Sequence, residues 1–339
     1  MRTRPNFSSS RRRALLALAA LGAPAASTWA QADPAAAAPA YWPSKPVKLL
    51  VAYPPGGVSD TVGRALAERL ATRLGVPVVV ENKAGASGMI GVDAAAKAPP
   101  DGYTLVLTAT SPLTLSPQLV KAPYDPLKDL VAVAPVMTSP VLLLATSAAP
   151  EGDLKALLAR ARDGRQPLRW ATSGSGSVGH VMLELVKAAA KTEIVHVPYK
   201  GGGQPLQDAV AGHFELLSTN AASAVTQQIK AGKLRPLAVG APERLAHFPQ
   251  VPTLAELGFP AANLSSTFAV FGPAGLSPSA QSRLEMEIHW VLAGPQMRER
   301  LAAAETVMLR LSAAQLQAQV VQEAELMARV VREARIKAD

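Results

Sequence analysis

Short apolar runs alternate with helix-periodic segments along this 339-residue chain, and this alternation restricts the fold more than any other feature. Residues 47–52 (VKLLVA) have the length and composition of a buried strand. The next segment carries apolar side chains at helical spacing and then a glycine stop signal: Val62, Leu66, Leu70, Leu74 and Gly75. Further strand-like and helix-like segments follow in turn, at 76–80, 90–97 and 105–108. The order predicts βαβ units and a parallel sheet.

The same order restarts in the second half of the chain. Strand-like runs occupy 141–145, 168–172, 194–198 and 234–239. The helix-like segments between them span 154–162, 181–191 and about 205–211. Two α/β units of similar layout predict two domains with a cleft between them. We expect domain 1 to be discontinuous (33–138 plus 266–339) and domain 2 to span 139–265.

The C-terminal part is predicted to be helical. Ser277 followed by Pro278 is typical of a helix start, and this helix should reach about Leu292. Ser312 and Gln315 have the spacing of a capping box, which predicts a last helix that ends near Ala334.

The N-terminus has the pattern of an export signal. Arg11, Arg12 and Arg13 form a positive segment, and a short apolar run (14–26) and a small-x-small cleavage pattern at 30–32 follow. The run is too short for a bilayer, which needs about 20 apolar residues. We therefore expect residues 1–32 to be removed near Ala32 and the mature protein to be soluble in the periplasm. Both the general secretory and the twin-arginine routes remain open.

Composition excludes several classes of function. Residues 1–32 carry five arginines and no acid, so without them the net charge falls from +9 to +4. Aromatic residues make up only 4% of the chain, and no concentrated basic patch is present, so nucleic-acid binding is not expected. Cysteine is absent, which removes disulfides, cysteine-based metal sites and thiol nucleophiles. A mildly positive body is compatible with an anionic ligand.

Three glycine-rich loops each follow a strand and open a helix: 53–60 (YPPGGVSD), 173–180 (SGSGSVGH) and 198–203 (PYKGGG). Glycine lets a backbone approach a ligand closely, and a helix N-terminus offers N–H groups with partial positive charge. Each loop alone is most often an ordinary turn. Three of them in both halves of the chain favour a shared cleft that holds a carboxylate or phosphate.

The sequence lacks the residues that dinucleotide binding, hydrolysis or metal binding would require. Gly174, Gly176 and Gly179 match a dinucleotide fingerprint, but the acid expected after the next strand is missing, so no cofactor is expected. No nucleophile elbow and no metal-binding spacing of the histidines is present, so we expect neither catalysis nor a metal. His180 is interpreted as a residue that hydrogen-bonds its own loop. Asp60 is interpreted as a helix cap or as a contact to a ligand hydroxyl or ammonium group.

The order of several motifs carries a family resemblance. They include WPSKPVKLLVAYPPGGVSD (42–60), ATSGSGSVGH (171–180) and IVHVPYKGGGQPLQDAVAGH (194–213). With these segments the chain resembles the Bug-type receptors, the periplasmic solute-binding components of tripartite tricarboxylate transporters. The resemblance covers about 42–339.

The resemblance implies a type II periplasmic-binding-protein fold that closes on a small organic carboxylate and delivers it to membrane permease subunits. A monomer is expected. By position it assigns ligand binding to two groups of residues, one per half: Tyr53, Gly57, Val58, Ser59 and Asp60, and Ser173, Ser175, Ser177, Tyr199 and Gly201. Glu215 departs from the aspartate usual in the family, while Asn220 keeps a polar position and is assigned to the distal end of the ligand. A sensor that signals to a membrane protein, or an exported hydrolase, is the alternative.

Overall fold

The computed structural model describes residue 1, residues 42–164 and residues 167–337. Every element described below belongs to one compact unit that begins at Trp42. Apart from Met1, the predicted export signal lies outside the described residues. Across the described ranges, no helix has both the length and the apolar character needed to cross a bilayer.

Sheet A is built from the N-terminal strands and from a strand that returns late in the chain. β1 (Val47–Val51) pairs in parallel with β2 (Val78–Asn82) and β3 (Thr104–Ala109). β9 (Ser265–Pro273) lies between β3 and β4 (Leu130–Ala145) and is antiparallel to both. The sheet is therefore mixed rather than purely parallel as predicted. The reason is connectivity, since β9 brings the chain back from the second sheet.

Sheet B contains the strands of the middle of the chain. β5 (Leu168–Thr172) is parallel to β6 (Ile194–Pro198) and to β7 (Leu216–Asn220). β7 and β8 (Arg235–Gly240) both pair antiparallel with the last residues of β4. The 16-residue strand β4 thus belongs to both sheets and passes from A to B at Pro140–Val141. The division into domains at 138/139 and 265/266 stays a prediction.

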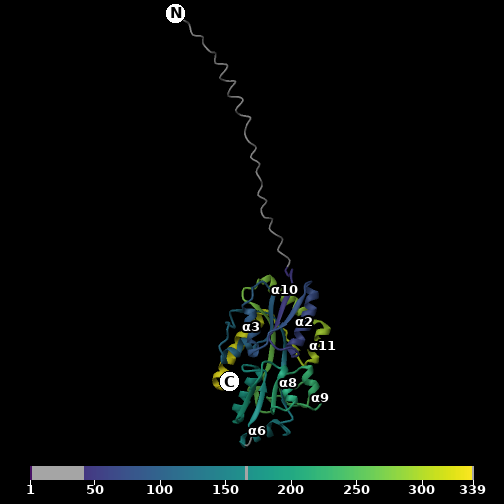
Figure 1. The fold of residues 1–339 in the computed structure, drawn as a ribbon, viewed down its shortest axis with the longest axis vertical. Helices are drawn as coiled ribbons and strands as arrows, with labels where there is room; N and C mark the ends of the chain where they lie inside the picture. Colours follow the sequence, from purple (N-terminus) through teal and green to yellow (C-terminus); the bar gives the residue numbers. More distant parts are fainter. Residues whose placement is uncertain (2–41, 165–166, 338–339) are drawn as a thin grey trace. The chain divides into compact units, whose positions relative to one another are not determined.

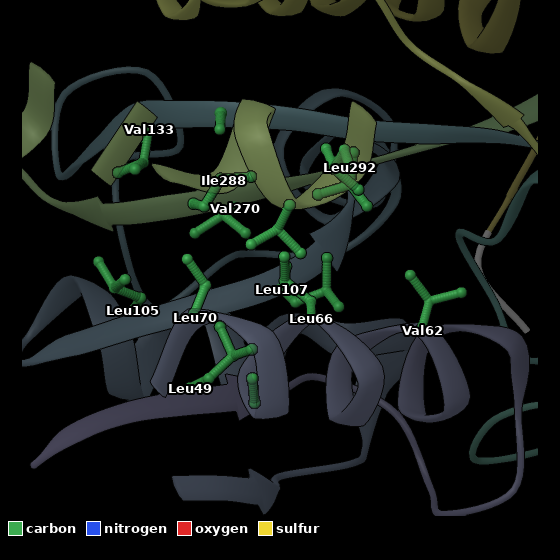
Figure 2. Packing of buried hydrophobic residues seen from close by; sticks show 14 of the residues in the cluster. Leu49, Val62, Leu66, Leu70, Leu105, Leu107, Val133, Val270, Ile288 and Leu292 are labelled. Carbon is green, nitrogen blue, oxygen red and sulfur yellow. The ribbon is translucent and has the colours of Figure 1, made fainter. Parts of the chain in front are cut away.

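Helices cover both faces of sheet A, so its strands are apolar on both sides. Leu49, Leu105 and Leu107 face the cluster formed with α2 (Val58–Leu74) and α10 (Pro278–Ala293). Figure 2 shows the side chains of α2 turned toward these strands: Val62, Leu66 and Leu70. The alternate strand residues face α3 (Met89–Ala96) and α12 (Ala313–Glu333). Each fully buried leucine contributes about 1.5–3 kcal/mol to stability.

Sheet B is covered in the same way. α6 (Leu154–Arg162) and α7 (Val178–Ala190) pack on one face, around Trp170. α8 (Gly203–Val210) and α9 (Ser223–Lys230) pack on the other, around Phe214. We call sheet A with its helices the A half and sheet B with its helices the B half. Figure 1 shows the purple-blue start of residues 42–337 in the A half and the teal middle in the B half, with the yellow helix α12 extending from the A half toward the B half.

Most predicted elements are present with small shifts in their ends. The capping box of Ser312 and Gln315 is confirmed at the start of α12, and Ser277 caps α10 as expected. Several elements were not predicted: residues 130–140 of β4, then β7, α9 and β9, and also α11 (Pro295–Ala303) and β10 (Val307–Met308).

Candidate ligand-binding site

A pocket lies where the carboxyl ends of parallel strands from both sheets meet. β1 and β3 end there on the A side, and β5, β6 and β7 lead into it on the B side. The cavity volume of the pocket is about 80 Å³, which is enough for roughly six water molecules. In open α/β sheets, ligands bind at this end of the strands.

Four helices of eight residues or more begin at the pocket, within the part of the chain that the structure describes. These are α2, α7, α8 and α9, and residues of the first turn of each line the wall. The N-cap residues of three of them have no side chain that can accept a hydrogen bond: Gly57, Gly202 and Ala222. The N-terminus of each helix carries a partial positive charge of about half an elementary charge. The site is therefore electropositive without a basic side chain.

The side chains of the wall are hydroxyls, one amide and apolar groups. The A half supplies Ser59, Ser87, Ser111 and Ser266, with Tyr53 and Phe268 in edge-to-face contact at 6.0 Å. The B half supplies further polar groups: Ser173, Ser177, Ser218, Thr219 and Asn220. Among the described lining residues, none has a charged side chain. No cluster of His, Cys, Asp or Glu suited to a metal occurs among the residues that the structure describes.

The two halves touch each other beside the pocket. Ser87 Oγ donates to the carbonyl of Ser175 at 2.6 Å, and Ser116 Oγ donates to the carbonyl of Gly176 at 3.1 Å. At Gly201, φ is +132° and a Cβ would lie 2.3 Å from Pro54 Cδ, so only glycine fits without movement. The structure is thus a conformation in which the halves are in contact.

His180 supports the glycine-rich loop from behind. Its ring is fully buried, and its Nδ1 accepts a hydrogen bond from the Gly176 N–H at 3.2 Å. The ring stacks on His196 at 4.3 Å between centroids. The expectation that His180 hydrogen-bonds its own loop is confirmed.

The pocket brings together most of the residues that the sequence assigned to the ligand. Those lining it are Tyr53, Gly57, Val58, Ser59, Ser173, Ser177 and Asn220. Outside the lining are Asp60, Ser175, Tyr199 and Gly201. That any of these residues binds a ligand stays a prediction.

The carboxylate of Asp60 forms hydrogen bonds with other residues of the protein. Its carboxylate accepts hydrogen bonds from the Gly56 N–H at 3.0 Å, from Arg64 at 3.0 Å and from Asn82 at 2.9 Å. Burial by itself raises the pKa of Asp60, but these hydrogen bonds outweigh it and hold the pKa below its usual range. The carboxylate is ionised and its oxygens are occupied, which favours a role in shaping the first loop.

The other three residues outside the lining shape the edge of the pocket. Ser175 contributes its carbonyl to the contact with Ser87, and Gly201 packs against Pro54. The hydroxyl of Tyr199 donates to Asp208 at 2.5 Å, and burial together with this bond raises the pKa of Tyr199 to about 12.

Several lining residues had not been assigned to the site from the sequence. The main ones are Ser87, Ser111, Gly202, Ser218, Thr219, Ser266 and Phe268. Most lie on elements that local periodicity did not reveal, such as β7 and β9, or in loops far apart in sequence. Gly202 belongs to the third glycine-rich loop (198–203), so the glycine motif itself could have identified it as a site residue.

Comparison with known proteins identifies the family. The family model described as "Tripartite tricarboxylate transporter family receptor" matches residues 62–336. The chain is a member of this receptor family. The receptor is 38% identical to Protein BugT of Bordetella pertussis over 264 residues, which cover 77% of this chain and 81% of that protein.

Solved structures agree with this family. The receptor matches "R. palustris Rpa4515 with adipate" with a TM-score of 0.82 and 31% identity, over 88% of this chain and all of the other. It also matches "MatC (Rpa3494) from Rhodopseudomonas palustris with bound malate", with a TM-score of 0.80 and 29% identity, over 85% and 99% of the two chains. The expected fold class, a type II periplasmic-binding-protein fold with its ligand cleft, is confirmed. So is the resemblance to Bug-type receptors.

Proposed function

We propose that the receptor binds a small organic carboxylate in the pocket between its two halves and passes it to the permease subunits of a tripartite tricarboxylate transporter. The observation that carries this proposal is the convergence of four helix N-termini on a pocket lined by hydroxyls. Backbone N–H groups at helix starts hold carboxylates without a basic side chain. The related structures with adipate and malate support the same class of ligand.

Ligand capture in this proposal is a closing movement of the halves as domains, with 138/139 and 265/266 as their boundaries. β4 and β9 run side by side where the A half meets the B half, and Pro140 pairs with Ser265 there. Rotation about these strands separates Ser87 from Ser175 and Pro54 from Gly201, which opens the pocket. Binding stabilises the closed arrangement. The receptor catalyses no reaction in this scheme.

The proposed setting is the periplasm. Residues 1–32 are proposed to be an export leader removed near Ala32, leaving a monomer. Mass spectrometry of the protein recovered from a periplasmic extract tests the cleavage, and an intact N-terminus on all of it would contradict this part.

A thermal-shift and calorimetric screen tests ligand class. Mono-, di- and tricarboxylates are compared with sugars and amines; at least one carboxylate should raise the melting temperature and bind stoichiometrically. If only sugars or amines bind, the proposed function is wrong.

Gly202→Leu tests the location of the site. The φ of Gly202 is −86°, and a Cβ there lies 3.5 Å from the pocket residue Thr219, so a leucine projects into the pocket without backbone strain. Filling the pocket should weaken the binding of the carboxylate found in the screen about tenfold or more. Gly152→Leu is the matched control, because a Cβ at Gly152 meets open space in the B half. Equal affinities for the two variants would place the ligand elsewhere.

A further inference from the structure

A groove on the surface of the receptor is formed by elements of both halves. Its lining residues come from α2 and α11 of the A half and from Ser223 at the start of α9 in the B half, and its cavity volume is about 520 Å³. Figure 1 shows α2, α11 and α9 along the same edge of the structure. The Oγ of Ser223 donates to the carbonyl of Ala303 at 3.5 Å. The groove therefore has this shape only while the two halves are in contact.

The groove lies beside the ligand pocket but uses different residues. In the first turn of α9, Ser223 lines the groove, whereas Ala224 and Val225 line the pocket. On α2, the pocket residue Ser59 is followed two positions later by the groove residue Thr61. A molecule bound in the groove would therefore contact both halves without touching the ligand.

Charged side chains of both signs line the groove. Within the part of the chain that the structure describes, none of the four forms an ion pair: Glu68, Arg69, Glu299 and Arg300. The buried residues of the lining are small or apolar: Ala65, Met297 and Ala304. A partner that covers the four charges must present charges of opposite sign, because a charge that is buried without a partner is costly. The groove therefore fits a polypeptide segment that carries both acidic and basic side chains.

An exposed tryptophan lies one helical turn beyond the groove. Arg73 follows the groove residue Arg69 by four positions on α2, so the two lie on the same face of the helix. The guanidinium of Arg73 lies over the ring of Trp290 at 4.0 Å, and its Nε donates to Glu287 at 2.6 Å. Trp290 is 58% exposed, and Met286, one turn earlier on α10, is 54% exposed.

We call Arg73, Met286 and Trp290 the anchor. Tryptophan, methionine and arginine are enriched in protein interfaces, and tryptophan and arginine often contribute most of the binding energy. The contacts of Arg73 with Trp290 and Glu287 hold these side chains in place before a partner arrives, which reduces the entropy lost on association.

We propose, building on the proposed function, that the groove and the anchor together form the surface on which the receptor docks to its permease. The partner is a segment of the permease, exposed to the periplasm, that carries acidic and basic side chains for the groove and apolar side chains for the anchor. Because the groove includes Ser223 of the B half, docking favours the arrangement in which the halves are in contact. The permease thereby distinguishes a closed receptor from an open one without touching the ligand.

A comparison of uptake with binding tests the docking surface. In the bacterium that encodes the receptor, its gene is replaced by each variant, and uptake of the radiolabelled carboxylate found in the screen is measured. Trp290→Ser and the double variant Arg69→Glu/Arg300→Glu should each lower uptake about fivefold or more, because each removes contacts with the permease. The affinity of the purified variants for the carboxylate should change less than about twofold, since none of the three residues lines the pocket.

Matched controls lie on α12, which covers the opposite face of sheet A from α2. Leu326 is 45% exposed, and Arg329 and Arg332 are exposed arginines without an ion pair among the described residues. Leu326→Ser and Arg329→Glu/Arg332→Glu should support wild-type uptake. Wild-type uptake with Trp290→Ser or with Arg69→Glu/Arg300→Glu, or an equal loss in the matched control, would overturn the inference while the proposed function stands. So would a loss of affinity as large as the loss of uptake. If the wild-type gene fails to restore uptake of a carboxylate that binds, both are wrong.

Cross-linking tests the contact directly. The chain has no cysteine, so a single cysteine at Gln296, an exposed groove residue, can carry a photoreactive group. With the purified permease subunits in lipid vesicles, this label should give an adduct with a permease subunit, and more of it with the carboxylate than without. The same label at Gln322, which is exposed on α12, is the control. No adduct from Gln296, equal adducts from both positions, or an adduct that the carboxylate does not increase would overturn the inference.

Discussion

At the scale of single residues, the contact between the halves depends on positions that have no side chain. Gly174 and Gly201 both have φ above +130°, and a Cβ on either would lie within 2.7 Å of atoms at the edge of the pocket. Such backbone conformations are rarely adopted by other residues. These glycines therefore have two roles. They allow a backbone turn that residues with a side chain rarely adopt, and they let the two halves approach each other closely.

We predict that Gly201→Ala weakens ligand binding by holding the halves apart. A methyl group would lie 2.3 Å from Pro54 Cδ at a φ of +132°, so closure would require Pro54 or the loop to move. We expect affinity to fall by about tenfold, measured by calorimetry with the best ligand of the screen. Gly232→Ala is the control, since its Cβ meets open space at a φ of +67°. A wild-type affinity for Gly201→Ala would show that this contact does not limit closure.

At the scale of elements, α12 connects the two halves on one side of the molecule. Its first turns pack on sheet A through Leu316 and Val320. Its later residues, Met327 and Val331, join a separate cluster with Val181 of α7. Between these contacts lies Glu323, whose burial raises its pKa, although the hydroxyls of Thr110 and Thr114 partly offset the shift. A helix that spans both halves thus contains a partly buried acid.

The position of Glu323 predicts a pH-dependent stability. Because the folded-state pKa is raised, the unfolded chain loses this proton first, so the contribution of Glu323 is complete below about pH 4.5 and decreases as pH rises through the folded-state pKa. Glu323→Gln keeps an acceptor for both threonine hydroxyls and cannot ionise. It should therefore raise the free energy of unfolding above neutral pH and leave it nearly unchanged at pH 4. Urea denaturation at both pH values measures this, and a variant less stable at both would contradict it.

At the scale of the whole molecule, the proposed site would recognise a charged ligand through backbone dipoles from both halves. The long-range field is weak, because a leaderless chain would carry a net charge of only +4. Ion pairs that depend on exposed charges are screened by salt over about 10 Å at 0.1 M, whereas buried interactions are screened much less. Binding in the proposed site would be an interaction of the second, buried kind.

We therefore predict that affinity for the preferred carboxylate depends little on salt. Raising NaCl from about 50 to about 500 mM should change the dissociation constant by less than about threefold. Calorimetry at several NaCl concentrations tests this, with a chloride-free salt as the control for direct chloride competition. A steep loss with every salt would indicate recognition by exposed basic side chains instead.

The sequence predicted the parts of the fold that local patterns determine. Helix α2 and its glycine stop, the two α/β repeats and the capping box of Ser312 follow from spacing alone. β4 was only partly predicted, because Pro135 and Pro140 argue against a strand; Pro135 is tolerated where the register shifts against β9. The antiparallel return of β9 depends on contacts between residues more than a hundred positions apart, which no local pattern contains.

The candidate site was predictable to a similar extent. The glycine-rich loops identified where the helix starts converge, and most of the assigned residues line the pocket. Asp60 was ambiguous because a carboxylate in a first helical turn serves equally as a cap, a loop support or a ligand contact. Ser218 could not be singled out, because its place in the pocket wall appears only once β7 and α7 pack together.

The glycine contacts beside the pocket also have an evolutionary consequence. The halves meet through backbone at Gly174, Gly176 and Gly201, whereas the ligand would be chosen by wall side chains such as Ser218 and Asn220. In the proposed function, closure and ligand choice would therefore depend on separate positions. A few substitutions in the wall could then change the ligand while the closing movement is kept, so that one scaffold could give rise to many receptors.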